Sequence, residues 1–317
     1  MTQMPSPSAP LKIGTRGSPL ALAQAHETRE RLMTAFDLPQ EAFEIVIIKT
    51  TGDDRSMIAN DIPLKEIGNK GLFTKEIEEA LLAGGIDIAV HSMKDMPTVQ
   101  PEGLMLDCYL PREDTRDAFI CSHADTIHDL PQSAVVGTSS LRRRAQLLNR
   151  RPDLEVVEFR GNLQTRLKKL EDGVAFATFL ACAGLKRMKI PGVPMTPIDT
   201  DDMLPALAQG AIGIERRVGD ALTERLLAPL HHHDTGLRLA AERSFLKTLD
   251  GSCETPIAGL AELDGDQLRL RGEILKTDGS LSHAGEISGS IKDGAALGES
   301  LAKELLAKAG PDFFDHL

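Results

Sequence analysis

The sequence has few of the side chains from which nucleic-acid and membrane interfaces are built. Its 317 residues include no tryptophan, one tyrosine and ten phenylalanines, so aromatic platforms for stacking bases are scarce. A net charge of −11 also argues against nucleic-acid binding by the chain as a whole. No segment approaches the roughly 20 consecutive apolar residues of a membrane helix. We therefore expect neither a nucleic-acid-binding protein nor a membrane protein.

Targeting signals and paired cysteines are also lacking. The first ten residues are uncharged and have neither the basic start nor the apolar core of a secretory signal, so we expect a cytoplasmic chain. Cys108, Cys121, Cys182 and Cys253 match no zinc or redox spacing, which predicts free thiols. The first three adjoin apolar residues and are predicted to be small buried hydrophobes. Cys253 lies in a turn-rich loop, where that explanation does not apply.

The order of apolar and polar segments predicts an α/β fold. Between residues 11 and 214, short apolar strands alternate with polar loops and helices, a pattern typical of parallel sheets covered by helices. Similar strand-to-helix turns begin at Gly14 and Gly137, which suggests two related α/β domains. The last 80 or so residues instead predict a small α+β domain. The predicted divisions are residues 1–110 with 211–230, then 115–205, and finally 233–317.

Cations and hydrogen-bond donors follow the predicted strands. In open α/β sheets, ligands bind beyond the carboxyl ends of the strands, where helix N-termini favour anions. Arginine adds a fork that matches a carboxylate. The side chains at such places are Arg16, Ser18, Lys94, Asp95, Ser139, Ser140, Arg142, Arg143 and Arg160.

Local charge sharpens this prediction. Residues 142–187 hold eleven Lys or Arg and five Asp or Glu, a net charge of +6 in an acidic chain. Three consecutive arginines cannot share one helix face, so we expect Arg144 to lie on the surface. A solvated helix face is the simplest alternative for the whole run, and nucleic acid is another. We favour a site for a small polycarboxylate or phosphate.

Two further features leave alternatives open. Asp95 follows an apolar strand and Lys94, so it is either a turn cap or a carboxyl that exchanges protons with, or stabilises positive charge on, a ligand. Three consecutive histidines occupy residues 231–233. Consecutive histidines cannot all enter one coordination sphere, so we predict no metal site there.

Seven motifs in register resemble the porphobilinogen deaminase (hydroxymethylbilane synthase) family. They are GTRGSPLA (14–21), GLFTKE (71–76), AVHSMKD (89–95), VGTSSLRR (136–143), RGN (160–162), QGA (209–211) and AER (241–243). The resemblance implies two domains similar to periplasmic binding proteins, with a cleft between them, and a third domain with a cysteine on a mobile loop. It also implies a monomer.

The resemblance further implies roles for individual residues. Cys253 matches the cysteine that holds a dipyrromethane cofactor through a thioether, and Asp95 matches the catalytic carboxyl. For cofactor binding the matching positions are Cys253, Arg142, Arg143, Lys94 and Ser140. For porphobilinogen and the growing pyrrole chain they are Arg16, Ser18, Arg160, Arg166, Arg187, Lys65 and Lys70.

The implied reaction suits these charges. Four porphobilinogen molecules, each with two carboxylates, would condense with loss of ammonia into the linear tetrapyrrole hydroxymethylbilane, in haem biosynthesis. Departures from the family pattern include Ser252 and Ala208 at positions where glycine is common, and Glu66 where lysine is common. The main alternative is a non-catalytic, two-lobed binding protein for a polycarboxylate, which would not need Cys253.

Overall fold

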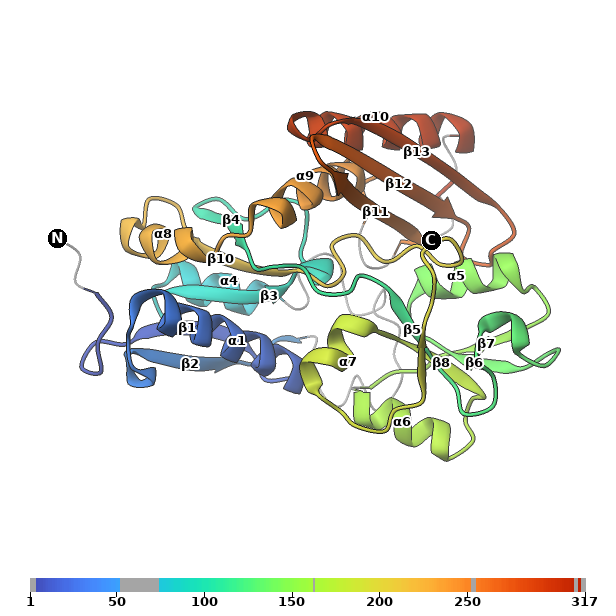
Figure 1. The fold of residues 1–317 in the computed structure, drawn as a ribbon, viewed down its shortest axis with the longest axis horizontal. Helices are drawn as coiled ribbons and strands as arrows, with labels where there is room; N and C mark the ends of the chain where they lie inside the picture. Colours follow the sequence, from blue (N-terminus) through green and yellow to red (C-terminus); the bar gives the residue numbers. More distant parts are fainter. Residues whose placement is uncertain (1–3, 52–73, 162, 252–254, 311–312, 315–317) are drawn as a thin grey trace. The chain divides into compact units, whose positions relative to one another are not determined.

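The chain forms two compact units, each described here by itself. The computed structural model describes residues 4–51, 74–161, 163–251, 255–310 and 313–314 (Figure 1). Among these, unit 1 comprises residues 4–51, 74–113 and 210–236, and unit 2 comprises the described residues of 114–209 and 237–314. No helix in these ranges is both long and apolar enough to cross a membrane.

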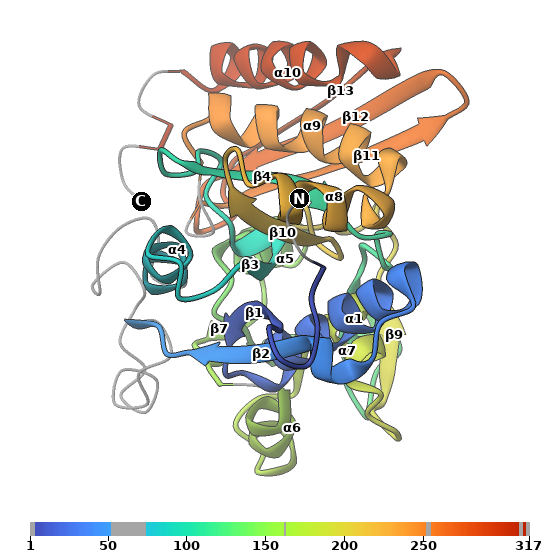
Figure 2. The ribbon, with the colours of Figure 1, turned by 90° about the vertical axis from the view of Figure 1, so that its left-hand side faces the viewer.

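Unit 1 is built on a five-stranded mixed sheet. Its order is β2-β1-β3-β10-β4, with bounds β1 Leu11–Arg16, β2 Phe43–Ile48, β3 Ile88–Ser92, β4 Leu104–Tyr109 and β10 Ile212–Arg217. Strands β2, β1 and β3 are parallel, whereas β10 runs antiparallel to both β3 and β4. Figure 2 shows α1 (Pro19–Phe36) and α4 (Lys75–Leu82) on either side of β1 and β3. The remaining short helices are η1 Gln40–Ala42, η3 Met93–Asp95, α8 Ala221–Leu227 and η5 Ala228–Leu230.

Local sequence explains how α1 begins beside β1. Ser18 is the N-cap, and its Oγ accepts a hydrogen bond from the Ala21 N–H at 3.3 Å. Pro19 follows in the first turn, where its missing N–H costs nothing. Leu32 of α1 then packs with Ile13 and Ile88 in the core, all at 0% exposure. This packing fixes the loop between β1 and α1.

The sheet of unit 2 repeats the strand pattern of unit 1. Its order is β7-β6-β8-β5-β9, with bounds β5 Asp117–Ile120, β6 Val135–Gly137, β7 Glu155–Val157, β8 Ala177–Ala181 and β9 Met195–Pro197. Strands β7, β6 and β8 are parallel, and β5 runs antiparallel to β8 and β9. Its helices are η4 Ile127–Asp129, α5 Leu141–Arg150, α6 Leu163–Glu171 and α7 Cys182–Met188.

The predicted relation between the two α/β halves is thus confirmed, with one addition. Gly14 of β1 and Gly137 of β6 occupy equivalent strands, and an added Cβ would collide with the Ile86 side chain in the first and with the Phe159 side chain in the second. Both positions therefore favour glycine for close packing. The predicted parallel arrangement holds for β2-β1-β3 and for β7-β6-β8, and the structure adds one antiparallel strand to each sheet, β10 or β5.

The C-terminal part of unit 2 is an antiparallel sheet covered by two helices. Strands β11 (Ile257–Asp264), β12 (Gln267–Leu275) and β13 (Ser282–Ser290) pair in order. η6 (Ile291–Asp293) leads into α10 (Gly294–Ala309), and α9 (His233–Thr248) precedes the sheet. Phe245 of α9 and Leu301 of α10 share one core with Leu270 of β12. The fold class, two α/β sheets with a small α+β part, is confirmed.

Candidate active site

A small pocket in unit 1 brings together residues from four segments. It encloses about 70 Å³ and lies where β1 and β3 end, the place expected for ligands in such sheets. Its lining residues are Arg16, Ser18, Leu20, Ala21, Gln24, Thr74, Val90, His91, Ser92, Asp95 and Met96. The pocket therefore unites three of the predicted site residues, Arg16, Ser18 and Asp95.

The elements around the pocket explain how these three side chains meet. Arg16 is the last residue of β1, and Ser18 caps α1 immediately after it. Asp95 ends η3, the short helix that directly follows β3. Because β1 and β3 are parallel neighbours, their carboxyl ends bring a guanidinium, a hydroxyl and a half-buried carboxyl to one place. Lys94, the neighbour of Asp95, is half-buried but does not line the pocket.

A buried hydrogen-bonded pair shapes one wall. The side-chain amide of Gln24 donates to Ser92 Oγ at 2.8 Å, and the distance from Ser92 Oγ to Gln24 Oε1 is 3.0 Å. Gln24 is only 3% exposed. The pair ties α1 to the end of β3 and so holds the strand from which Asp95 follows.

A histidine and two carboxyl groups form a buried cluster on α4's side of the sheet. His91 Nε2 lies 3.2 Å from Glu215 Oε2, with side-chain exposures of 5% and 0%. Glu78 of α4 is also buried, and its pKa is raised by burial and by the nearby Glu215 carboxylate. Burying an ionised carboxyl costs free energy unless the group has a charged or hydrogen-bonding partner. The sequence did not predict this cluster.

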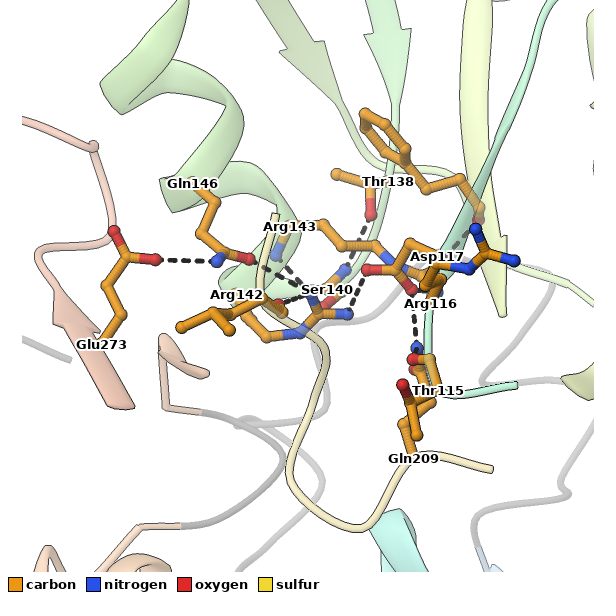
Figure 3. A network of polar contacts seen from close by, with 12 residues as sticks. Thr115, Arg116, Asp117, Thr138, Ser140, Arg142, Arg143, Gln146, Gln209 and Glu273 are labelled. Carbon is orange, nitrogen blue, oxygen red and sulfur yellow. Dashed lines mark hydrogen bonds and ion pairs between the residues drawn. The ribbon is translucent and has the colours of Figure 1, made fainter. Parts of the chain in front are cut away.

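In unit 2, Arg142 and Arg143 converge on one buried aspartate (Figure 3). Arg142 Nη2 lies 2.8 Å from Asp117 Oδ2, and Arg143 Nη2 lies 2.7 Å from Asp117 Oδ1. Gln209 donates to the same Oδ1 at 2.9 Å, and Arg143 also donates to the Phe179 carbonyl at 3.0 Å. Asp117 is fully buried, while Arg142 and Arg143 are 4% and 6% exposed.

The charges of this cluster are strongly coupled. Burial alone would raise the pKa of Asp117, but Arg142 and Arg143 outweigh burial and lower it well below its usual range. Two guanidinium groups and one carboxylate leave a net charge of +1. Arg144, the third consecutive arginine, is exposed, as predicted.

The cluster continues into the C-terminal sheet of the same unit. Arg142 donates to Gln146 Oε1 at 3.1 Å, and Gln146 donates to Glu273 Oε2 of β12 at 2.8 Å. Glu273 also accepts a hydrogen bond from Ser282 of β13 at 2.8 Å. Figure 3 shows how Gln146 lies between Arg142 and Glu273. These bonds connect the N-terminal half of α5 to two strands of the sheet that follows α9.

Two other predicted cations of unit 2, Arg166 and Arg160, have no close carboxylate partner among the described residues. Arg166 donates to the Gly161 carbonyl at 3.0 Å, and among the described residues no carboxylate oxygen forms an ion pair with it. Burial, followed by repulsion from Arg143, lowers its pKa to about 10. Arg160 has only a long ion pair, 3.9 Å, with Glu158. Ser140 caps α5 by accepting from the Arg143 N–H at 3.4 Å, and Arg187 lies in the last turn of α7.

Three predicted site residues, Cys253, Lys65 and Lys70, lie outside the described residues. The other cysteines, Cys108, Cys121 and Cys182, are buried free thiols, as predicted. Burial raises the pKa of Cys108 to about 12 and that of Cys182 to about 11, so neither is a ready nucleophile.

The sequence analysis assigned no role to Asp117, Glu215, Gln24 or His91. The sequence carried little signal for the two acids, since Asp117 begins β5 and Glu215 is followed by two arginines at the end of β10. No signal marked Gln24, which sits among other small and polar residues of α1. His91 lies in a quoted motif, but nothing in the sequence indicated its carboxylate partner.

Comparison with known proteins decides the family. Residues 11–225 match the porphobilinogen deaminase dipyrromethane cofactor-binding domain, and residues 237–307 match the porphobilinogen deaminase C-terminal domain. The chain belongs to the porphobilinogen deaminase family. It is 66% identical to the porphobilinogen deaminase of Paracoccus denitrificans over 315 residues, 99% of each chain.

Family membership settles the activity at the level of the whole protein. Porphobilinogen deaminases condense four porphobilinogen molecules into hydroxymethylbilane with loss of ammonia, and this transferase activity is that of the present chain. The cofactor of the family is dipyrromethane. A non-catalytic binding protein, the alternative from the sequence, is not favoured.

Solved structures with a similar fold include two periplasmic proteins. One is the aliphatic sulphonate-binding protein of Escherichia coli, 14% identical, with a TM-score of 0.39 over 76% of this chain and 70% of that one. Another is the periplasmic VFT2 domain of Bordetella pertussis BvgS, 15% identical, with a TM-score of 0.39 over 74% and 92%. At such scores neither likeness bears on what a porphobilinogen deaminase binds.

The described residues of unit 2 fit a cofactor that carries carboxylates. Arg166 is a cation made less stable by burial and by Arg143, so an incoming carboxylate would stabilise it. Arg160 and the N-terminus of α5 at Ser140 add further donors. In the described part of the chain, no group of three or more His, Cys, Asp or Glu side chains is arranged to hold a metal ion.

Proposed function

We propose that Asp95 is the catalytic carboxyl of this porphobilinogen deaminase and that its pocket receives the reacting end of the substrate. One observation carries the proposal: Arg16, Ser18 and Asp95 line the same pocket at the ends of β1 and β3. Arg16 and Ser18 offer donors for a substrate carboxylate. Asp95 then stabilises the positive charge that develops at the substrate methylene carbon as ammonia leaves.

The cations of unit 2 are proposed to hold carboxylates of the cofactor and growing chain. Arg160 and Arg166 are the best placed, because neither is neutralised by a close carboxylate of the described residues. Arg142 and Arg143 act beside them, oriented by Asp117, and Ser140 contributes the cap of α5. Four further cations are proposed as supporting residues on the family match alone. They are Lys94 of unit 1, Arg187 of unit 2, Lys65 and Lys70.

Cys253 is the proposed point of attachment. A thiol nucleophile forms the thioether, and the bound dipyrromethane supplies the free pyrrole carbon to which the first substrate is joined. The three other cysteines are buried free thiols, and burial raises the pKa of Cys108 and Cys182. Of the four cysteines in the sequence, Cys253 is the one that matches the family position.

Intact mass tests the attachment. The purified chain is expected to exceed its sequence mass by one dipyrromethane, and Cys253→Ser is expected to lose that increment. Cys182→Ser serves as the matched control and should keep it. A Cys253→Ser protein that retains the extra mass would disprove the attachment site.

Turnover tests the role of Asp95. Asp95→Asn keeps the shape of the side chain but removes its charge, so we expect porphobilinogen consumption to fall about 100-fold or more, as for loss of a proton-transferring or charge-stabilising group. The melting temperature should stay near that of the wild type. Normal turnover by Asp95→Asn would exclude the proposed role.

Three broader expectations are also proposals. We propose a monomer located in the cytoplasm, where the reducing environment keeps the attachment thiol available. We further propose three domains, residues 1–110 with 211–230, 115–205 and 233–317, supported by the three separate sheets. Sedimentation tests the monomer, cell fractionation tests the cytoplasmic location, and mapping of limited-proteolysis sites tests the domain boundaries.

A further inference from the structure

His91 combines a buried carboxylate partner with a place in the wall of the pocket. Its Nε2 lies 3.2 Å from Glu215 Oε2, and the residue lines the pocket together with Asp95. Asp95 follows four positions later, beyond the end of β3. The mechanism proposed above assigns His91 no task.

The chemistry of the pair determines which ring nitrogen is basic. An ionised carboxylate accepts hydrogen bonds but donates none, so the contact with Glu215 places the proton on Nε2 of a neutral ring. The lone pair is then on Nδ1. Within the described part of the chain, Nδ1 makes no hydrogen bond. A carboxylate partner of this kind fixes the tautomer and the orientation of the ring.

The surroundings supply the charges that such a base would feel. Glu215 of β10 is fully buried, and its Oε1 has no hydrogen-bond partner among the described residues. Glu78 of α4 lies near enough to interact with both His91 and Glu215. Arg16 of β1 and Asp95 of η3 line the same pocket. Carboxyl groups thus predominate around His91.

We propose that His91, oriented by Glu215, is a second catalytic residue that accepts the proton released when each pyrrole is joined. The proposal rests on the assignment of the pocket around Asp95 as the reaction site. It divides the work between two groups: Asp95 stabilises the cationic carbon, and His91 Nδ1 takes up the proton.

The step balances without another reagent. The substrate C–N bond breaks, and ammonia leaves with the electron pair from the ammonium form of the substrate. The methylene carbon then forms a C–C bond with the free α-carbon of the terminal ring of the chain. The C–H bond at that α-carbon breaks, its electrons restore the ring, and its proton moves to His91 Nδ1. The imidazolium later passes the proton to water or to the departed ammonia.

His91→Gln is the most informative substitution. The glutamine amide can still donate to Glu215, so a purely structural pair would be largely preserved, but the side chain no longer titrates. With cofactor-loaded enzyme and porphobilinogen as substrate, we expect kcat to fall about 100-fold. The KM for porphobilinogen should stay near the wild-type value, because a side chain that donates to Glu215 is retained. His128→Gln, which alters an exposed histidine 3.5 Å from Asp202, is the matched control and should leave both kcat and KM unchanged.

A second measurement does not depend on turnover. In the wild type, ¹⁵N chemical shifts of the His91 ring should show a proton on Nε2 and none on Nδ1 at neutral pH. Glu215→Gln removes the carboxylate that fixes this tautomer, so a signal from protonated Nδ1 should appear and kcat should fall. If Glu215→Gln does not fold by circular dichroism, the wild-type tautomer and the kcat of His91→Gln decide the question.

The outcomes separate this proposal from the proposed role of Asp95. Normal kcat in His91→Gln, or a proton on Nδ1 in the wild type, would each overturn it. Asp95→Asn, measured in the same series, reports on Asp95 alone. If Asp95→Asn kept its turnover and His91→Gln lost it, the role proposed for Asp95 would be rejected. The pocket would remain the proposed place of proton transfer.

Discussion

Arg143 and Asp117 form a buried ion pair across the sheet of unit 2, with 2.7 Å between Nη2 and Oδ1 and 26 residues between them in sequence. Arg142 binds the other oxygen of the same carboxylate at 2.8 Å. The two arginines that the family match assigns to cofactor binding therefore also serve the fold. Asp117 sets the direction of both guanidinium groups before any ligand arrives.

The first prediction concerns the strength of this cluster. Asp117→Asn would leave two buried guanidinium groups without a counter-charge, so we expect the free energy of unfolding to fall by about 3–5 kcal/mol. Denaturant unfolding monitored by circular dichroism measures it. Asp172→Asn removes the exposed partner of Lys168 and should change stability by only about 0.5 kcal/mol. If both substitutions lowered the free energy of unfolding equally, the buried ion pairs of Asp117 would contribute no more to stability than an exposed pair.

The second prediction is the pH range in which Asp117 stabilises the fold. Its pKa is lowered in the folded chain, so its contribution is fully present above the unfolded pKa of about 3.9 and is lost as pH falls through the folded value. Between pH 5 and 8 the stability difference between wild type and Asp117→Asn should be constant. It should shrink only in strongly acidic solution, and a difference that shrinks between pH 7 and 5 would contradict the assignment.

The third prediction separates cofactor binding from stability at Arg166. Because burial and Arg143 already make this cation less stable, Arg166→Met should cost the fold less than about 1 kcal/mol, the order of one hydrogen bond. The fraction of chains that carry the cofactor, measured by intact mass, should nevertheless fall sharply. Arg166→Lys should be intermediate, since it keeps the charge but not the fork.

Arg144→Met is the control for this series, because Arg144 is exposed on α5. It should load cofactor normally. Full loading in Arg166→Met as well would remove Arg166 from the proposed binding set.

The fourth prediction concerns Ala208, which stands where glycine is common in the family. Its φ is +60°, a left-handed conformation that costs a residue with a Cβ roughly 1–2 kcal/mol. Ala208→Gly should remove this cost, but glycine also has more conformational entropy in the unfolded chain, which offsets part of the gain. We expect the free energy of unfolding, measured by thermal denaturation, to rise by about 0.5–1 kcal/mol. Ala307→Gly, on the exposed side of α10, should lower stability by about 1 kcal/mol. Destabilisation by both would reject the strain at Ala208.

Local patterns in the sequence were enough to predict several parts of the fold. The exposed Arg144 and the buried thiols of Cys108, Cys121 and Cys182 depend on neighbours within a few residues. The similar strand-to-helix turns that begin at Gly14 and Gly137 likewise indicated two related α/β halves, and the structure places these glycines in the equivalent strands β1 and β6.

Sequence alone determined which residue types stand at the strand ends, and the motifs there identified the family. Only the tertiary structure decided which of those side chains meet. Strands β5 and β10 enter their sheets antiparallel, between strands that do not adjoin them in sequence. They bring Asp117 beside Arg142 and Arg143, and Glu215 beside His91. No local pattern specifies such pairings, because the energy of a buried charge depends on a partner that folding brings from elsewhere in the chain.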